Sequence, residues 1–201
     1  MKVGKLEATG SFFLVWAWLN YVDGQGIVPW AMLACVLHEV GHYGAIRFLG
    51  GDIRLIRLTA VGGEMGLARP LGYCQEGIAA LAGPGVNLLL AAFLSQLGWG
   101  YTFAGINLML GCFNLMPISR LDGGRALFCT LALLLGPSWA ELILKWLSAA
   151  ATALILVLGM LVIGLGGNLT LLLVAVWLVA VFFSGKKKGN RACHMSWKRL
   201  K

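Results

Sequence analysis

The stretch AMLACVLHEVGHYGAIRFLGG, residues 31–51, places two histidines and a glutamate inside a run of apolar residues. Ionisable side chains at membrane depth are costly, and they usually mark a functional site that faces a protein interior or a water-filled cavity. His38 and His42 are separated by one helical turn, so a helix would present both on one face. His-Glu-x-x-His on a helix supplies two nitrogen ligands for zinc, with the glutamate beside them as general base. Two buried histidines satisfied by ordinary hydrogen bonds are the alternative.

The composition of the chain is that of a membrane protein. Hydrophobic residues make up 59% of the 201 residues and charged residues 12%, whereas soluble domains are about a quarter charged. The five cysteines are an odd number and lie mostly in or beside apolar segments, so we infer no disulfide framework. The length predicts a single transmembrane domain over residues 1–185, followed by a basic tail over residues 186–201.

Roughly 20 apolar residues are needed to cross a bilayer, and several segments approach this length. We therefore expect an all-α membrane protein with about six transmembrane helices. A further apolar segment, Gly124–Leu135, is too short to span and is predicted to be a half-helix or re-entrant piece. The expected spans are Gly10–Val22, Ile27–Leu49, Gly77–Leu97, Tyr101–Ile118, Trp146–Leu165 and Leu169–Phe183.

The segment Asp52–Arg69 differs from its neighbours because apolar and polar residues alternate along it and two glycines follow. This pattern predicts a short re-entrant or interfacial β-hairpin after the second helix, turning at Gly62-Gly63. An ordinary amphipathic loop is the alternative.

The basic residues indicate the membrane topology. With the N-terminus in the cytoplasm, all 16 Lys and Arg fall on one side of the six-span arrangement. This is the positive-inside pattern, so we expect both termini in the cytoplasm, in a bacterial-type inner or cell membrane. The net charge of +8 is spread over short loops and the tail, which argues against a nucleic-acid partner. We expect the tail to bind anionic lipid headgroups.

A catalytic zinc takes three protein ligands and leaves one position for water, so the two histidines need a further partner. Asp122 lies between two apolar segments, and Pro117 and Gly123-Gly124 are expected to break the helix there. Non-helical backbone at membrane depth survives only where it lines a protein cavity. A cytoplasmic turn closed by Asp-Gly-Gly is the alternative reading of the same residues.

These residues together predict a metal site. His38, His42 and Asp122 would hold one Zn²⁺ per chain, which would make a water ionise near neutral pH. Glu39 would take the proton of that water and pass it on as the catalytic base.

The same motifs resemble those of the site-2 protease family of intramembrane zinc metalloproteases. The resemblance covers residues 27–125, about half the chain, with the elements in family order. Its most specific part is the pair of HExxH and Asn-x-x-Pro-x-x-x-Leu-Asp-Gly. The matching segments are His38–His42, Asn114–Pro117 and Leu121–Gly124, with Ala82–Asn87 similar to the family's Gly-Pro-x-x-Asn element and Gly62-Gly63 to its hairpin region.

The resemblance implies an intramembrane zinc endopeptidase that cleaves a membrane-embedded or membrane-associated protein in regulated intramembrane proteolysis. It implies that Asp122 is the third zinc ligand. It also implies that the hairpin offers a strand edge to an unwound substrate segment, for which we expect edge positions such as Leu58 or Thr59. The substrate-positioning residues implied are Asn114, Asn87, Gly62 and Gly63.

No segment between the motifs is long enough for a PDZ insertion. The chain thus looks like a compact relative of the six-span branch that processes a membrane-bound sigma-factor precursor during sporulation, for which a regulatory membrane partner is also expected. A non-catalytic metal-binding membrane protein, such as a transporter or sensor, is the alternative function. A transporter is expected to show several intramembrane ionisable residues along a path, or inverted repeats, and neither is visible. A pseudoprotease that chaperones a membrane partner is a third possible function. The presence of Glu39 and all three metal ligands argues against it.

Overall fold

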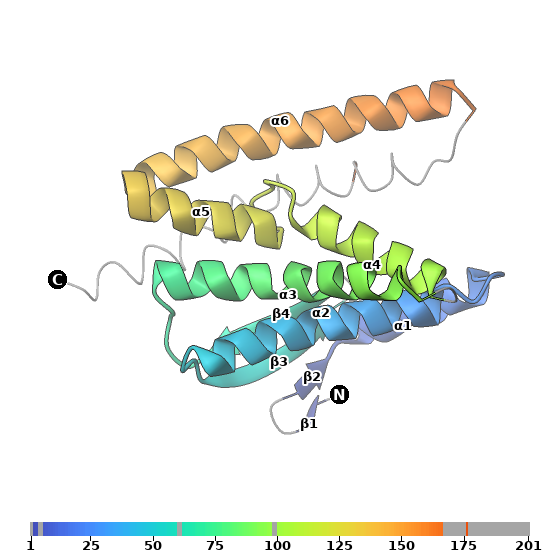
Figure 1. The fold of residues 1–201 in the computed structure, drawn as a ribbon, viewed down its shortest axis with the longest axis horizontal. Coiled ribbons are helices and arrows are strands. Elements are labelled where there is room, and N and C mark those ends of the chain that lie inside the picture. The colour runs from blue at the N-terminus through green and yellow to red at the C-terminus, as the bar shows by residue number, and fades with distance from the viewer. Residues whose placement is uncertain (1, 4–5, 60–61, 98–99, 167–175, 177–201) are drawn as a thin grey trace. The chain divides into compact units, whose positions relative to one another are not determined.

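The computed structural model describes residues 2–3, 6–59, 62–97, 100–166 and 176 of the chain. The chain divides into two compact units, Met1–Leu115 and Met116–Lys201. The described residues are mostly helical with one small sheet, as the sequence predicts in outline. The elements of the first unit are β1 (Lys2–Val3), β2 (Leu6–Ala8), α1 (Gly10–Val22), α2 (Val28–Phe48), β3 (Ile53–Thr59), β4 (Gly62–Leu67), α3 (Tyr73–Leu94) and α4 (Tyr101–Asn114) (Figure 1).

The predicted hairpin is present as the antiparallel pair β3 and β4. Its turn was misplaced, because Gly62 and Gly63 already belong to β4 and pair with Thr59 and Leu58. The connection between the two strands therefore contains residues 60–61. Glycine weakens a strand, and it often marks a site where another group approaches the backbone closely.

The strand β2 lies on the other side of β3 and pairs with it in parallel, Leu6 opposite Ile56. The order of the sheet is β1-β2-β3-β4, which makes β3 an internal strand. The carbonyl of Leu58 accepts a hydrogen bond of 3.0 Å from the backbone N–H of Thr9. The expectation that Leu58 is an edge position is therefore wrong, since β2 pairs with β3 as far as Leu58.

Capping interactions define both ends of α2, the helix of the HExxH motif. At its start, the Asp23 carboxylate accepts hydrogen bonds from the backbone N–H groups of Val28, Ile27 and Gln25. These bonds, that of Val28 foremost, hold the pKa of Asp23 below its ordinary value. At its end, Gly50 takes φ +80° and the N–H of Gly51 reaches the carbonyl of Ile46 at 2.8 Å. This is the Schellman termination, which redirects the chain into β3.

Apolar side chains join the end of α2 to the sheet and to the start of α3. Ile46, Ile53 and Ala79 are buried together, one from each of these elements. The partly buried side chains around them come from the end of α2, the two strands of the hairpin and the connection before α3, and include Ile56 and Met65. The hairpin is thereby fixed against the helix that carries the HExxH motif.

The second unit consists, in its described part, of α5 (Asp122–Leu135) and α6 (Pro137–Gly164). The segment Gly124–Leu135, predicted as a half-helix or re-entrant piece, is helical and forms most of α5. Gly123 and Gly124 lie in the first turn of α5, so the expectation that they break a helix is wrong. Non-helical backbone precedes Asp122 instead. A β carbon on Gly124 would collide with the carbonyl of Ile118, so this glycine permits close packing of the preceding loop on the helix.

The helix α6 begins at Pro137 rather than at the predicted Trp146. Proline is favoured in the first helical turn, and Gly136 with φ +85° supplies the bend from α5. The added first turns of α6 carry the polar side chains of Glu141 and Lys145, both of which are exposed.

Two helices in the described part of the chain are long and apolar enough to cross a membrane, α3 and α6. The helix α1 is apolar but only 13 residues long. The expected six spans are therefore not confirmed. The predicted sixth span, Leu169–Phe183, falls outside the described residues except for Val176, as does the basic tail.

Candidate metal centre

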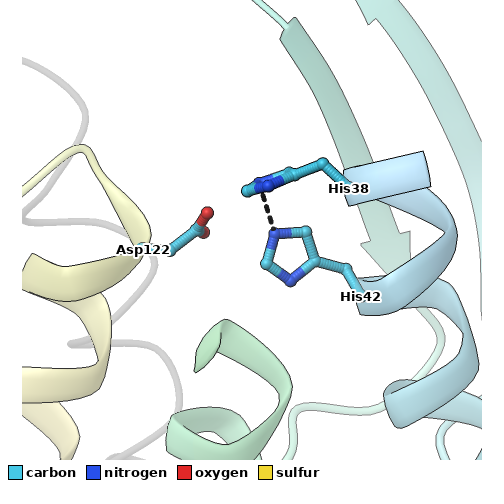
Figure 2. A group of neighbouring side chains, drawn as sticks. All are labelled: His38, His42 and Asp122. Atoms are coloured by element: carbon cyan, nitrogen blue, oxygen red, sulfur yellow. Dashed lines mark hydrogen bonds between the residues drawn. The ribbon is translucent and has the colours of Figure 1, made fainter. Parts of the chain in front are cut away.

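His38 and His42 lie on one face of α2, as their spacing predicts, and both are buried. Their Nε2 atoms are 3.0 Å apart and their ring planes are nearly perpendicular, at 82°. Figure 2 shows the two imidazoles turned toward each other, together with Asp122.

The other ring nitrogen of His42 fixes the protonation of this imidazole. His42 Nδ1 is 2.7 Å from the backbone carbonyl oxygen of Ala79 on α3. A carbonyl oxygen can only accept, so Nδ1 must carry the proton and donate it. In the neutral ring, His42 Nε2 is then the atom with the lone pair.

The same reasoning applies to His38, whose Nδ1 is 2.5 Å from Asn87 Oδ1 on α3. The amide of Asn87 is oriented by its own donors, because Nδ2 donates to the carbonyl of Ala34 at 3.3 Å and to Asn107 Oδ1 at 2.7 Å. Oδ1 must therefore face His38 and accept its Nδ1 proton. His38 Nε2 also keeps its lone pair.

Two neutral rings in these tautomers point their lone pairs at each other, which is repulsive unless a proton or a cation lies between them. Two nitrogens bound to tetrahedral zinc at 2.0–2.1 Å would be about 3.3 Å apart. The observed Nε2–Nε2 distance of 3.0 Å is close to that spacing. Histidine ligands also commonly donate their second ring N–H to a carbonyl or carboxylate, as both do here. The donor set and its orientation fit a zinc ion.

Glycines bring α3 close to this pair. A β carbon on Gly83 would be 2.8 Å from His38 Nε2 and closer still to His42 Nε2. A β carbon on Gly41 of α2 would be 2.9 Å from the carbonyl oxygen of Ala82. The two helices lie side by side (Figure 1) and can approach this closely only because both positions lack a side chain.

Glu39 follows His38 on α2 and reaches the sheet. Its Oε1 accepts a hydrogen bond of 3.3 Å from the backbone N–H of Gly63 in β4. The N–H of Gly63 therefore points away from β3. Its pairing partner Leu58 likewise turns its carbonyl away from β4, because that carbonyl accepts from Thr9 on the other side of β3. The carboxylate therefore lies at the outer edge of the hairpin.

Asp122 is the first residue of α5 and is 9% exposed. The amino end of a helix stabilises a carboxylate, and Arg125 approaches it at 3.5 Å. The loop before Asp122 is held by Ser148 of α6, whose hydroxyl accepts from the Ser119 N–H at 3.0 Å and donates to the carbonyl of Pro117 at 3.3 Å. Among the described residues, His38 and His42 of the first unit and Asp122 of the second offer the ligand atoms suited to hold a metal ion (Figure 2).

The residues expected to position substrate have other contacts in this structure. Asn87 is fully buried and bound to His38, so its visible role is to orient a ring. Asn114 is partly buried and donates to the Leu110 carbonyl of its own helix at 3.0 Å. Gly63 contacts Glu39, and Gly62 precedes it in β4. A direct role of these residues in substrate binding stays a prediction.

Asn107 and Ser148 support the site but were not predicted from the sequence. Both lie in apolar helices and are fully buried. A buried amide or hydroxyl is costly without a hydrogen-bond partner, so each could have been recognised as half of a polar pair. The identity of the partner follows only from helix packing.

No family model matches the chain. A zinc metalloprotease of Methanocaldococcus jannaschii is 30% identical over 180 residues, which cover 80% of this chain and 50% of that protein. The putative zinc metalloprotease Rip3 of Mycobacterium tuberculosis is 30% identical over 133 residues, covering 58% of this chain and 33% of Rip3. The chain thus spans about half the length of the curated relatives it matches, or less. The solved structure of a site-2 protease from M. jannaschii superposes with a TM-score of 0.66 and 25% identity, covering 94% of this chain and 93% of that one.

Proposed function

Because the chain belongs to the site-2 protease family, we propose that it is a zinc metalloendopeptidase that cleaves a membrane-embedded or membrane-associated protein. The observation that carries this proposal is the pair of converging Nε2 atoms on α2. Glu39 follows His38 in the same helix, and its carboxylate is held by the N–H of Gly63. The chain spans only part of its curated relatives, so activity and substrate class belong to the proposal.

His38, His42 and Asp122 are the proposed metal ligands. The two imidazoles offer Nε2 lone pairs, and the carboxylate of Asp122 adds a negative oxygen donor. Two histidines and one carboxylate are a known ligand set of catalytic zinc, which leaves one position for water or substrate. This assignment is supported by the tautomers of both rings and by the ligand types of the three side chains.

When bound, zinc supplies a Lewis acid that lowers the pKa of a water and polarises a carbonyl oxygen. Glu39 is the proposed general base that takes the proton of the attacking water and later delivers it to the leaving nitrogen. The Gly63 N–H at 3.3 Å orients the carboxylate before substrate arrives.

The outer edge of β4 is the proposed binding edge for substrate. A transmembrane helix satisfies its own backbone, so it must unwind before a peptide bond becomes accessible. Backbone groups that face away from the neighbouring strand alternate along an antiparallel strand, which places the N–H of Met65 on the same side as that of Gly63. A strand added there would run past Glu39.

Residence in the membrane, with the termini in the cytoplasm, is also part of the proposal. It is supported by the apolar helices α3 and α6, of whose most hydrophobic windows only 33% and 22% are buried, and by the one-sided Lys and Arg distribution expected from the sequence. A role in sporulation, a sigma-factor precursor as substrate, a regulatory membrane partner and lipid binding by the tail remain expectations drawn from the sequence.

The test is zinc content and cleavage by the full chain purified from membranes, with Glu39→Gln as the matched variant. We expect about one zinc per chain in both proteins, and cleavage of a helical membrane substrate by the wild type only. Co-expression of Glu39→Gln with membrane proteins of the host should accumulate the uncleaved substrate. Zinc binding without cleavage by the wild type would favour the alternative of a non-catalytic metal-binding protein.

A further inference from the structure

A chain of buried hydrogen bonds runs from His38 through α3 to α4. His38 Nδ1 donates to Asn87 Oδ1, and Asn87 Nδ2 donates to Asn107 Oδ1 at 2.7 Å. Asn107 Nδ2 donates in turn to the backbone carbonyl of Phe103, one turn earlier in α4, at 2.9 Å. Both asparagines are 0% exposed.

The direction of every bond in this chain is dictated by its far end. The carbonyl of Phe103 can only accept, so it selects the Nδ2 end of the Asn107 amide. Asn107 then presents Oδ1, which selects the Nδ2 end of the Asn87 amide. Asn87 finally presents Oδ1, which only a protonated His38 Nδ1 can satisfy. The backbone of α4, together with the Ala34 carbonyl that also accepts from Asn87 Nδ2, thus determines which nitrogen of His38 keeps a lone pair.

We propose that Asn107 is a positioning residue of the metal centre, and that it acts on His38 through Asn87 without contacting the metal. This inference rests on the proposed role of His38 as a ligand. Without Asn107, the Asn87 amide keeps the Ala34 carbonyl as an acceptor, at 3.3 Å, and loses its shorter bond. A rotated amide would present N–H to His38, which would move the ring proton to Nε2 and block coordination.

Two substitutions at position 107 separate this role from simple packing. Asn107→Leu has similar size but no polar atoms, so it removes the constraint on Asn87. Asn107→Asp keeps an oxygen that accepts from Asn87 Nδ2 in either protonation state. Loss of an outer partner of a metal ligand typically weakens metal binding about 10–100-fold. We expect about tenfold weaker zinc binding for Asn107→Leu and nearly wild-type binding for Asn107→Asp.

Thr152→Val is the matched control for loss of a buried hydrogen bond. The Thr152 hydroxyl donates to the Ser148 carbonyl of its own helix at 2.7 Å and is 5% exposed. Valine has nearly the same shape, and the position has no bond to either asparagine. Zinc binding by Thr152→Val should equal that of the wild type.

A double substitution tests the route through Asn87. Asn87→Asp in its ionised form offers only acceptor oxygens to the His38 N–H, so the orientation of the side chain no longer affects the ring. Asn107→Leu should therefore cost about tenfold in zinc affinity when Asn87 is present and close to nothing in the Asn87→Asp background. This coupling is not expected of two independent packing defects.

The experiment measures the zinc dissociation constant of the full chain by competition with a chelator, after confirming the helical content of each variant. Asn107→Ala replaces Asn107→Leu if the leucine variant does not fold. Wild-type affinity in Asn107→Leu would overturn the inference, as would equal losses in Asn107→Asp or Thr152→Val. A wild-type chain that binds no zinc would instead overturn the proposed metal site itself.

Discussion

The Glu39 carboxylate packs directly against the backbone of Gly63. A β carbon at this position would lie 2.7 Å from Glu39 Cδ and 2.8 Å from Oε2. The glycine is therefore required by the approach of a side chain from α2, and no turn demands it. This contact ties the proposed general base to the hairpin.

Gly63→Ala should accordingly impair catalysis while leaving the metal in place. The added methyl group would push the carboxylate away from its hydrogen bond, and loss of a positioned general base typically costs about 10²–10⁴-fold in rate. We expect a loss at the lower end of this range, with normal zinc content. Gly66→Ala is the control, since its β carbon would make an ordinary contact of 3.5 Å with Leu55. Equal rates for the two variants would refute the role assigned to the contact.

Gly83→Ala should impair metal binding instead. Its methyl group would lie 2.8 Å from His38 Nε2, in the space that a metal ion bound to this nitrogen would need. We expect zinc affinity to fall by at least about tenfold, the scale of defects around metal ligands. Gly85→Ala on the same helix meets nothing within 4 Å and should bind zinc normally. The zinc affinity of both variants is measured by competition with a chelator. Wild-type zinc affinity in Gly83→Ala would contradict the close approach of Gly83 to His38 Nε2.

Asp122→Ala should release zinc more readily than any exposed acidic substitution. Removing one of three protein ligands leaves two, so we expect the measured zinc content to fall well below one per chain after dialysis. Glu141→Gln, an exposed change on α6, is the control in the same unit. Should Asp122→Ala retain full zinc in a folded protein, the third ligand has been misassigned.

Met65→Pro tests the outer edge of β4. Proline removes the outward N–H and leaves the ladder bonds to β3 intact, a substitution that edge strands tolerate. We expect sharply slower cleavage of a helical membrane substrate with unchanged zinc content. Met65→Ala removes the same side-chain packing but keeps the N–H, so it should cleave faster than Met65→Pro. Indistinguishable cleavage by the two would mean that substrate pairs elsewhere.

The parts of the fold that could be predicted are those with a repeating local signal. The helix around His38 follows from its long apolar run, predicted as Ile27–Leu49 and observed as Val28–Phe48. The hairpin follows from the alternation after Asp52. The histidines and Glu39 were recognised because their types and spacing define a chemistry before any packing is known.

What could not be predicted depends on contacts between distant segments. The strand β2 has only three residues, too few for a periodic pattern, and it exists because β3 offers it an edge. The bond between Asn87 and Asn107 joins residues 20 apart on two helices, so only their crossing reveals it. The start of α6 was predicted at Trp146 and lies at Pro137, because the charged Glu141 and Lys145 interrupt the apolar run and yet fit an exposed helical face.

The pairing of β2 with β3 also has a practical consequence for expression and handling of the protein. Uncovered strand edges are sites where chains associate and aggregate. Removal of residues 1–8, or a bulky fusion that prevents β2 from pairing, would leave β3 with an open edge in addition to that of β4. Such shortened proteins should be more prone to self-association, and affinity tags are better attached at the other end of the chain.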